Sequence, residues 1–332
     1  MTAQPAPPER ILLIRTDRIG DLLMNLPALA WVRAAFPAAE LTLLLQQPVR
    51  PLMEGYPGVD RLIGWSPDEG NNLGAAWRWG KRLRPERFGA AVVLNPTRLF
   101  HAACFLAGIP VRIGYHRKWS FLLNRTLEDT KAERELHESR YNLELVQLLG
   151  LGSPQPLPEA PAAVPLPVPP AAAAGIESWL QQQGINPGEP LITIHPWTSN
   201  PEKSWPLESF CEVVRRLSQE GKRICLIGGT ENRPRMESLE KELPPGTIDG
   251  VGQVPLERLG ALLKRSRLLI SNDSGPAHIA SAVGTPTIIV APKTHERLLK
   301  RWRPMGDLCR LLFDPSPETV TAQAETLAQC GS

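Results

Sequence analysis

Three polar stretches of the sequence hold side chains that could do chemistry, and each directly follows an apolar run. They read RTDRIGDLL (15–23), HPWTSNPEKSWP (195–206) and SNDSGPAHIASAVGTPTIIV (271–290). Each stands where a buried strand is expected to end and a helix to begin. A plain turn needs fewer polar groups, so these stretches are candidates for ligand binding.

In the first stretch the candidate group is the carboxylate of Asp21. Gly20 permits a tight or positive-φ turn after the strand. Asp21 then falls at the start of the following helix, where aspartate is a favoured N-cap and suits the positive end of the helix. The same carboxylate could instead act as a base, and the residues alone leave both interpretations open.

The second stretch places a cation in a long polar turn. Ser199 and Asn200 favour turns, Lys203 supplies a mobile positive charge, and Pro206 suits the first position of a helix. An exposed polar loop with a solvated lysine is the alternative interpretation.

The third stretch predicts an anion-binding helix start. Pro276 at the first helical position makes Ser274 or Gly275 the N-cap, and the unpaired backbone N–H groups that follow suit an anion. His278 falls in the first turn, where the helix dipole favours its neutral form.

A glycine pair after another strand could approach a nucleotide. In GGTENRPR (228–235), Gly228 and Gly229 allow close backbone approach, and Glu231 could accept hydrogen bonds from a ribose.

Several common site motifs do not occur in the sequence. It contains no G-x-G-x-x-G, no G-x-x-x-x-G-K-[ST], no D-x-D and no H-E-x-x-H. A simple nicotinamide enzyme and a P-loop kinase are therefore not expected. Phosphate binding would rest on helix starts and Lys203, with no metal.

Strands and helices are expected to alternate through two regions of the chain. The first has apolar runs at 11–15, 41–45 and 90–95 with helical patterns at 21–36 and 137–150, and the second has runs at 191–195, 223–228, 267–271 and 287–291 with a helix at 206–220. Such alternation predicts an α/β protein with parallel sheets covered on both faces. Between the regions, residues 153–170 hold eight prolines, which exclude an ordinary helix or a central strand.

These patterns predict two doubly wound domains joined by a linker, with ligands at the carboxyl ends of the strands and a cleft between the domains. The expected domains are 1–152 and 173–332, and the linker is 153–172. The sequence leaves open that the last helix packs back on the N-terminal domain. A chain of 332 residues suits two domains.

Charge and cysteine usage indicate the surroundings of the protein. Residues 78–125 hold ten Lys or Arg and one acid, Glu86, which suggests an anionic partner or a membrane surface, or else solvated basic helix faces. The five cysteines are odd in number and far apart, which fits a reducing cytosol. No signal core or membrane-spanning run is expected, so we predict a cytoplasmic protein with at most peripheral membrane contact.

Six stretches of the chain, in order, resemble glycosyltransferase family 9, the ADP-heptose:lipopolysaccharide heptosyltransferases. They span roughly residues 11–291 and read ILLIRTDRIGDLLMNLPAL, IGYHRKW, HESRYNLELVQLLG, IHPWTSNPEKSWPLESF, LIGGTENRPR and ISNDSGPAHIASAVGTPTIIV. The resemblance implies a GT-B fold, with an N-terminal acceptor domain and a C-terminal nucleotide-sugar domain. It also implies an inverting transfer that needs no metal or other cofactor, with ADP-L-glycero-D-manno-heptose as donor.

The resemblance also implies a role for individual residues. Asp21 would be the general base, Lys203 would hold the donor phosphates, and Asp273 would bind the sugar hydroxyls. The remaining expected donor contacts are Ser274, Gly275 and Ser199 at the phosphates, Glu231 and Gly229 at the ribose or base, and His278 at the sugar. For an anionic glycolipid acceptor the expected contacts are Arg18, Gly20, Arg117 and Lys118. We expect a monomer that binds no nucleic acid and touches the inner membrane face.

Trp197 departs from the family pattern, since many relatives have glycine there. Its ring could stack on a sugar or base, narrow the donor pocket, or anchor the loop by packing. Three other functions stay open at this point: transfer of a different nucleotide-linked sugar, epimerisation of a sugar nucleotide, and non-catalytic binding of a nucleotide or glycan.

Overall fold

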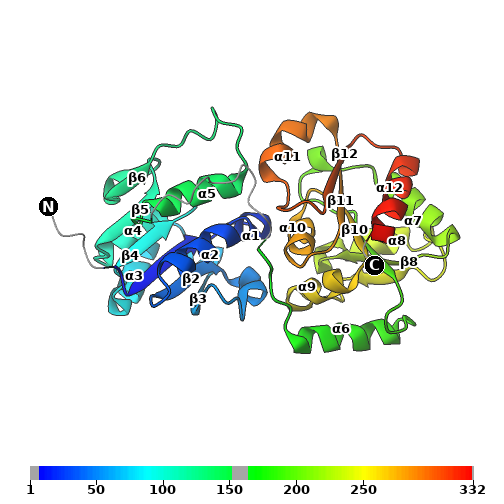
Figure 1. Ribbon diagram of the computed structural model, residues 1–332, viewed down its shortest axis with the longest axis horizontal. Coiled ribbons are helices and arrows are strands. Elements are labelled where there is room, and N and C mark those ends of the chain that lie inside the picture. The colour runs from blue at the N-terminus through cyan, green and yellow to red at the C-terminus, as the bar shows by residue number, and fades with distance from the viewer. Residues whose placement is uncertain (1–6, 152–163, 331–332) are drawn as a thin grey trace. The chain divides into compact units, whose positions relative to one another are not determined.

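The computed structural model describes residues 7–151 and 164–330. The chain forms two compact units, Met1–Val164 and Pro165–Ser332 (Figure 1). The two expected domains fall one in each unit. Most of the predicted proline-rich linker, residues 152–163, lies outside the described residues, and its last residues already belong to a helix that begins at Pro170.

The first unit is built on a six-stranded sheet in the order β3-β2-β1-β4-β5-β6, and the strand pairs along it are parallel. Its central strands are continuous apolar runs buried on both faces, as parallel sheets require. The strands are β1 (Arg10–Arg15), β2 (Glu40–Gln46), β3 (Arg61–Trp65), β4 (Ala90–Val93), β5 (Val111–Tyr115) and β6 (Arg125–Leu127). The helices are α1 (Ile19–Leu23), α2 (Leu26–Ala35), α3 (Leu73–Leu83), α4 (Arg98–Leu106) and α5 (Glu138–Gln147).

The second unit repeats this order with its own strands. Its sheet runs β12-β11-β10-β7-β8-β9, so that its first four strands take the places of β1 to β4. The strands are β7 (Leu191–His195), β8 (Arg223–Gly228), β9 (Ile248–Val251), β10 (Leu268–Asn272), β11 (Thr287–Ala291) and β12 (Cys309–Phe313). The helices are α6 (Pro170–Gln182), α7 (Leu207–Gln219), α8 (Arg233–Leu239), α9 (Leu256–Arg265), α10 (Gly275–Ala282), α11 (Glu296–Trp302) and α12 (Pro317–Cys330).

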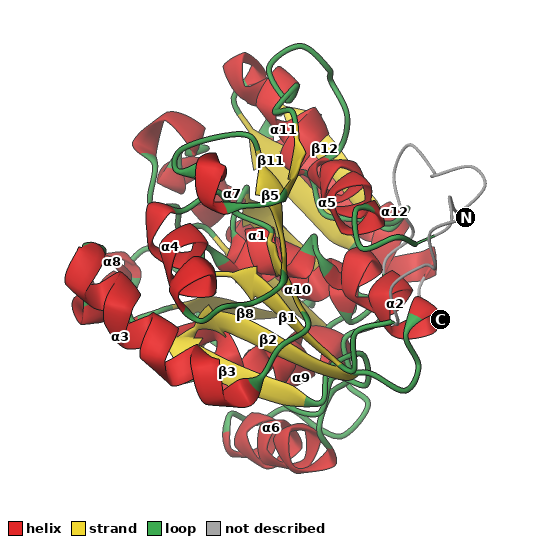
Figure 2. Ribbon diagram, turned by 90° about the vertical axis from the view of Figure 1, so that its left-hand side faces the viewer, coloured by secondary structure: helices red, strands yellow, loops and turns green. Residues whose placement is uncertain are grey.

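Helices cover the strands in both units (Figure 2). In the first unit α3 and α4 pack together on one face, where Trp79 and Phe100 meet edge to face with ring centroids 5.6 Å apart. In the second unit α7 buries the face predicted from the sequence, with Phe210, Val213 and Leu217 in the core. The predicted doubly wound α/β architecture is confirmed in each unit.

Some element boundaries differ from the predictions. The helix expected over 21–36 is broken in two. Met24 and Asn25, with ψ of -5° and -7°, form a turn between α1, which ends at Leu23, and α2, which begins at Leu26. Pro206 is the N-cap of α7 rather than its first residue, and the helix expected over 137–150 is α5, which ends at Gln147.

The last helix, α12, packs along α7 and places Val320 and Ala324 in the core of the second unit. Its main packing partners, α7, β10 and β11, are in its own unit.

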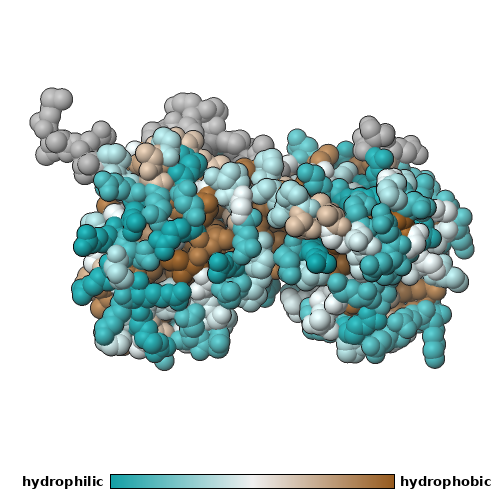
Figure 3. Space-filling view, turned by 90° about the horizontal axis from the view of Figure 1, so that it is seen from below, coloured by the Kyte–Doolittle hydropathy of each residue, from teal (hydrophilic) through white to brown (hydrophobic). Residues whose placement is uncertain are grey.

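Apolar side chains also reach the surface of the first unit between hydrophilic ones (Figure 3). None of the helices in the described part of the chain is long and apolar enough to cross a membrane.

Candidate functional site

The strand order of each unit marks one place where a ligand fits best. In this order the chain reverses direction across the sheet between β1 and β4, and again between β7 and β10. The loops that leave two such strands diverge to opposite faces, which opens a crevice at the carboxyl ends. All three polar stretches singled out in the sequence start at these two switch points.

At the first switch point the loop after β1 is held on both sides. The side chain of Asn95, just after β4, accepts from the backbone N–H of Thr16 at 3.1 Å and donates to its hydroxyl at 3.2 Å. Gln46, at the end of β2, donates to the carbonyl of Thr16 at 3.0 Å. These three contacts fix the start of the loop that carries Asp17 and Asp21.

A buried arginine at the end of β1 lies near three carboxylates, two that follow β1 and one at the start of α5. Arg15 is 2% exposed, and its guanidinium lies 2.7 Å from Asp17, 3.2 Å from Asp21 and 4.0 Å from Glu138. Glu138 is also buried and pairs with Lys131 at 2.6 Å. Because Arg15 is shared and Glu138 has its own lysine, Asp17 and Asp21 keep carboxylate oxygens for other partners.

The surroundings make both aspartates more basic than usual. Burial raises the pKa of Asp17 to about 6, with the charge of Asp21 adding to the rise and Arg15 opposing it. Burial also raises the pKa of Asp21, again opposed by Arg15 and reinforced by Glu138. A carboxylate whose pKa approaches neutrality is a better proton acceptor at physiological pH.

Asp21 is not the N-cap of α1. That position belongs to Arg18, whose side chain caps nothing, and Asp21 is the third helical residue. Its carboxylate accepts from the backbone N–H of Arg18, a contact that lowers its pKa. The expected N-cap role is therefore wrong in position, although part of the capping function remains. Gly20, expected in a positive-φ turn, is helical instead.

The other predicted acceptor residues follow β5 at the same edge of the sheet. Arg117 is exposed and pairs with Asp129 at 2.7 Å. Lys118 has a left-handed backbone, with φ of 56°, and donates to the carbonyl of Pro96 at 2.5 Å. A left-handed lysine costs backbone energy, so this turn is held by its surroundings.

At the second switch point a buried amide ties the two loops together. The side chain of Asn272, the last residue of β10, accepts from the backbone N–H of Trp205 at 2.9 Å and donates to the carbonyl of Pro196 at 2.6 Å. Asn272 is fully buried. It therefore has a structural role, closing the loop 196–206 against the start of α10.

This closure brings Lys203 and Asp273 together. Their side chains form an ion pair of 2.6 Å, with the lysine 21% and the aspartate 11% exposed. The sequence had suggested separate ligand contacts for the two residues, and the structure makes them one unit. An ammonium held by a carboxylate at a helix start keeps donor capacity for an incoming phosphate.

The start of α10 leaves backbone donors available. Ser274 is its N-cap, Gly275 its first residue and Pro276 its second, one place later than predicted. The hydroxyl of Ser274 caps nothing and instead contacts Nδ1 of His195 at 3.1 Å and the Ser271 hydroxyl at 2.8 Å. Burial lowers the pKa of His195 to about 4, so its ring is neutral near pH 7.

The remaining predicted donor contacts lie at the same edge of the sheet. His278 is buried in the first turn of α10, and Ser199 is exposed in the loop after β7. After β8, the carboxylate of Glu231 folds so closely over Gly229 that a Cβ there would lie 2.2 Å from an oxygen. Any larger residue at position 229 would push this carboxylate aside, and Glu231 is exposed to solvent.

Trp197 is a packed loop anchor. It is 3% exposed, and its indole N–H donates to the carbonyl of Ile227 at 2.9 Å. The ring belongs to the core of the second unit. Of the interpretations open from the sequence, packing is the one confirmed.

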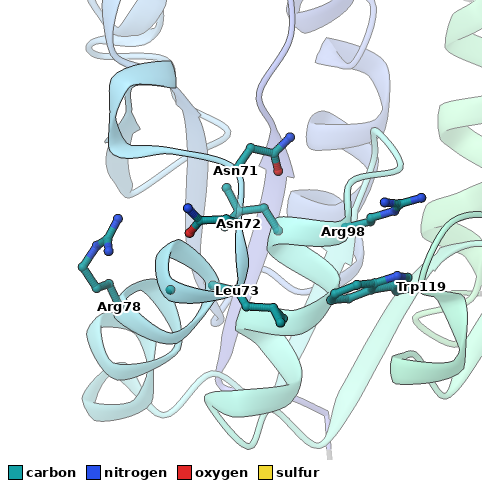
Figure 4. A pocket seen from close by; sticks show the side chains of 9 residues that line it. Asn71, Asn72, Leu73, Arg78, Arg98 and Trp119 are labelled. Atoms are coloured by element: carbon teal, nitrogen blue, oxygen red, sulfur yellow. The ribbon is translucent and has the colours of Figure 1, made fainter.

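The first unit also has a cavity at the carboxyl edge of its sheet. Its volume is about 630 Å³, and the residues that line it follow β3, β4 and β5. Figure 4 shows Arg98 above the ring of Trp119, with Leu73 pointing toward that ring. The Arg98 guanidinium lies 5.9 Å from the ring centroid. The cavity thus has an apolar wall and a cation.

Sequence reasoning missed four residues at these sites: Arg15, Asp17, Glu138 and His195. Arg15 looked like the end of a strand, and Glu138 lies far from Asp21 in the sequence. Asp17 was within the quoted motif, where its charge next to Asp21 was a usable signal. In the described residues, no group of three or more His, Cys, Asp or Glu side chains has a geometry that could hold a metal.

Comparisons with known proteins match this chain over most of its length. The sequence model of glycosyltransferase family 9 (heptosyltransferase) matches residues 76–328. Lipopolysaccharide heptosyltransferase 2 of Escherichia coli is 25% identical over 287 residues, which are 84% of this chain and 81% of that protein.

Solved structures show the same fold. A glycosyl transferase family 9 protein from Veillonella parvula superposes with a TM-score of 0.86 at 19% identity, covering 97% of both chains. The structure of E. coli ADP-heptose LPS heptosyltransferase II gives a TM-score of 0.80 at 21% identity, covering 97% of this chain and 99% of that one. Two doubly wound units with this strand order are the GT-B architecture, so that expectation is confirmed. With its family model matching more than half of the chain, the protein belongs to glycosyltransferase family 9, the heptosyltransferase family, and is a glycosyltransferase.

Proposed function

We propose that the protein transfers a heptose from ADP-L-glycero-D-manno-heptose to an anionic surface-glycan acceptor of the lipopolysaccharide-core type. The transfer inverts the anomeric centre and needs no metal ion. The observation that carries this proposal is the Lys203–Asp273 ion pair of 2.6 Å beside the open start of α10. The relatives named for lipopolysaccharide and ADP-heptose support the choice of acceptor and donor.

The donor binds to the second unit. The backbone N–H groups at Ser274 and Gly275, the Ser199 hydroxyl and the Lys203 ammonium bind the pyrophosphate, as a helix start and a cation do for anions. Glu231 accepts from the ribose over Gly229. Asp273 and His278 bind hydroxyls of the sugar, which places the charge pair at the junction between sugar and phosphate.

The first unit supplies the proton acceptor. Asp21 takes the proton of the acceptor hydroxyl while the oxygen attacks the anomeric carbon and the bond to ADP breaks. The negative charge that develops on ADP is stabilised by the donors of the second unit, and one such donor contributes about 3 kcal/mol. Burial and the negative charge of Glu138 raise the pKa of Asp21 and thereby keep it basic, while Arg15 fixes its position.

The acceptor binds to the same edge of the first sheet. Arg18, Gly20, Arg117 and Lys118 contact its anionic core, as expected from the sequence. The protein acts as a monomer in the cytoplasm, at the inner face of the membrane where a lipid-linked acceptor is found.

Calorimetric titration with ADP, UDP, GDP and CDP, with and without EDTA, tests the donor assignment. We expect selective binding of ADP that survives EDTA. A preference for UDP or GDP would move the function to another nucleotide sugar on the same fold. Loss of binding or of transfer with EDTA would overturn the metal-free mechanism.

A further inference from the structure

Exposed apolar side chains concentrate on one side of the first unit. Seven large hydrophobic residues are exposed among the described residues, and five of them belong to α3, α4 and the short turn that follows β5. These five are Leu73, Trp77, Phe105, Leu106 and Phe121. A soluble protein scatters such residues singly, whereas a group of them indicates a contact surface.

Helix α3 combines two kinds of side chain on its exposed face. Leu73 and Trp77 are 65% and 53% exposed and lie one turn apart. Lys81 continues the same row one turn later, and its ammonium lies 3.8 Å from the centroid of the Trp77 ring. No residue of α3 is acidic. An amphipathic helix with aromatic and basic residues on its outer face is typical of helices that lie on membranes.

The exposed residues of the neighbouring elements continue this surface. Gly80 lies against Leu106, so that a Cβ on the glycine would be 2.7 Å from that side chain. Across the cavity, Trp119 lies beside Phe121, with ring centroids 6.4 Å apart. We call the exposed side chains of α3 and its C-cap Arg84, of the end of α4 and of Phe121 the α3–α4 face.

The charge of this face is poorly balanced within the protein. Residues 70–127 hold ten Lys or Arg and one acid, Glu86, whose carboxylate is bound by Arg61 at 2.7 Å. Lys81 and Arg84 form no ion pair with any described residue. Their positive charge is therefore available to an external anion.

We propose that the α3–α4 face binds to the surface of an anionic lipid bilayer. Trp77, Phe105 and Phe121 enter the interface between head groups and acyl chains, and Lys81 and Arg84 bind lipid phosphates. A second copy of the chain fits this face less well, because two such faces would bring like charges together. The cavity that Leu73 and Trp119 line begins at the same end of α3, and so would be held near the lipid head groups.

This inference deepens the proposed function by naming the surface through which the enzyme reaches a lipid-linked acceptor. It does not depend on catalysis, because vesicle binding needs neither donor nor transfer. ADP titration of the same variants keeps the two proposals apart. Vesicle binding without ADP binding would contradict the proposed donor and support the membrane face. ADP binding without vesicle binding would support the proposed donor and contradict the membrane face.

Flotation of the full chain with lipid vesicles tests the proposal. We expect binding to vesicles of phosphatidylcholine mixed equally with phosphatidylglycerol, weak binding to phosphatidylcholine alone, and loss of binding at high salt. The double variant Lys81→Gln/Arg84→Gln should weaken binding about thirtyfold, since each cation near an anionic membrane contributes about fivefold. Trp77→Ser/Phe121→Ser should also weaken binding at least about tenfold.

Matched substitutions on the second unit serve as controls. Lys241→Gln/Lys264→Gln removes two exposed cations, and Leu298→Ser removes an exposed apolar side chain, all from the unit that does not carry the α3–α4 face. These variants should float like the wild-type protein. The proposal would be overturned if the control variants lost as much binding as the face variants, or if binding did not depend on lipid charge. It would also be overturned if Trp77→Ser abolished self-association of the protein. Salt-sensitive binding of DNA in place of vesicles would overturn it as well.

Discussion

The two switch points of this protein share a strand order and differ in the charge they collect. In the first unit, three carboxylates surround one buried arginine. In the second, a lysine pairs with one aspartate beside an open helix start, and a neutral histidine contacts the N-cap hydroxyl of that helix. Identical topology thus supports opposite electrostatics: the first edge favours accepting a proton, and the second favours holding an anion.

This difference teaches that the loops, and not the sheets, determine the chemistry. Each loop is fixed by a side-chain amide at the end of the neighbouring switch strand. This is half-buried Asn95 just after β4 in the first unit and buried Asn272 in the second. The charged residues of each loop lie within a few positions of the backbone groups that these amides bind. If the comparison is right, substitutions at the switch point of the first unit should affect turnover. Substitutions at the switch point of the second unit should affect donor binding.

The largest effect is expected for Asp21→Asn. This change keeps the shape of the side chain and removes its ability to accept a proton, so kcat should fall about 10²- to 10⁴-fold while ADP affinity hardly changes. Steady-state kinetics and calorimetry measure the two quantities. Asp17→Asn is the matched control on the same arginine. A greater loss from Asp17→Asn would identify Asp17 as the base.

The next largest effect is expected for Lys203→Ala, which should weaken ADP binding about 10- to 100-fold. A charge-assisted contact to phosphate is lost, and Asp273 is left without its cation beside an anionic ligand. Lys203→Arg should restore much of the affinity. If Lys203→Ala lowered kcat and left ADP affinity unchanged, Lys203 would act in turnover and not in donor binding. The two sheet edges would then not differ in function.

The pH dependence of kcat/KM should sharpen the contrast further. A base must be ionised to accept a proton, so activity should fall about tenfold for each pH unit below the pKa of the aspartate pair. Because burial raises the pKa of Asp21, this fall should begin at a higher pH than it would for an ordinary aspartate. Asp17→Asn removes a negative charge close to Asp21 and should move the fall to lower pH. A profile with its midpoint near pH 4, where an ordinary aspartate titrates, would contradict the raised pKa.

The smallest effect is expected for Trp197→Phe. The indole hydrogen bond to the Ile227 carbonyl is lost from a buried site, which should lower the free energy of unfolding by about 1 to 3 kcal/mol. Thermal or urea unfolding measures this change, and ADP affinity should move less than it does for Lys203→Ala. A large loss of ADP affinity with unchanged stability would mean that Trp197 contacts the donor after all.

The fold was predictable from the sequence because buried parallel strands leave continuous apolar runs. The strand beginning at Ile11 and the helix face of Phe210 and Val213 follow directly from that pattern. The break at Asn25 was missed although Pro27 signalled it, because the apolar spacing continues through the break.

The candidate sites were only partly predictable, for a different reason. Asp21 and Lys203 stand out because they are charged residues at strand ends. That Arg15 binds Asp21, or that Lys203 binds Asp273 at 2.6 Å, depends on which strands become neighbours. Such pairs join residues far apart in the chain, and local patterns carry no information about them.

The packing of Trp197 has an evolutionary consequence. A Cβ on Gly228 would lie 2.5 Å from the indole nitrogen of Trp197, so Gly228→Ala should be harmful in this chain. The same change should be far better tolerated once Trp197 is replaced by glycine, the residue that the family resemblance led us to expect there. The size of the effect of one substitution thus depends on the other, which makes the two positions epistatic. As long as Trp197 is present, position 228 should tolerate only glycine.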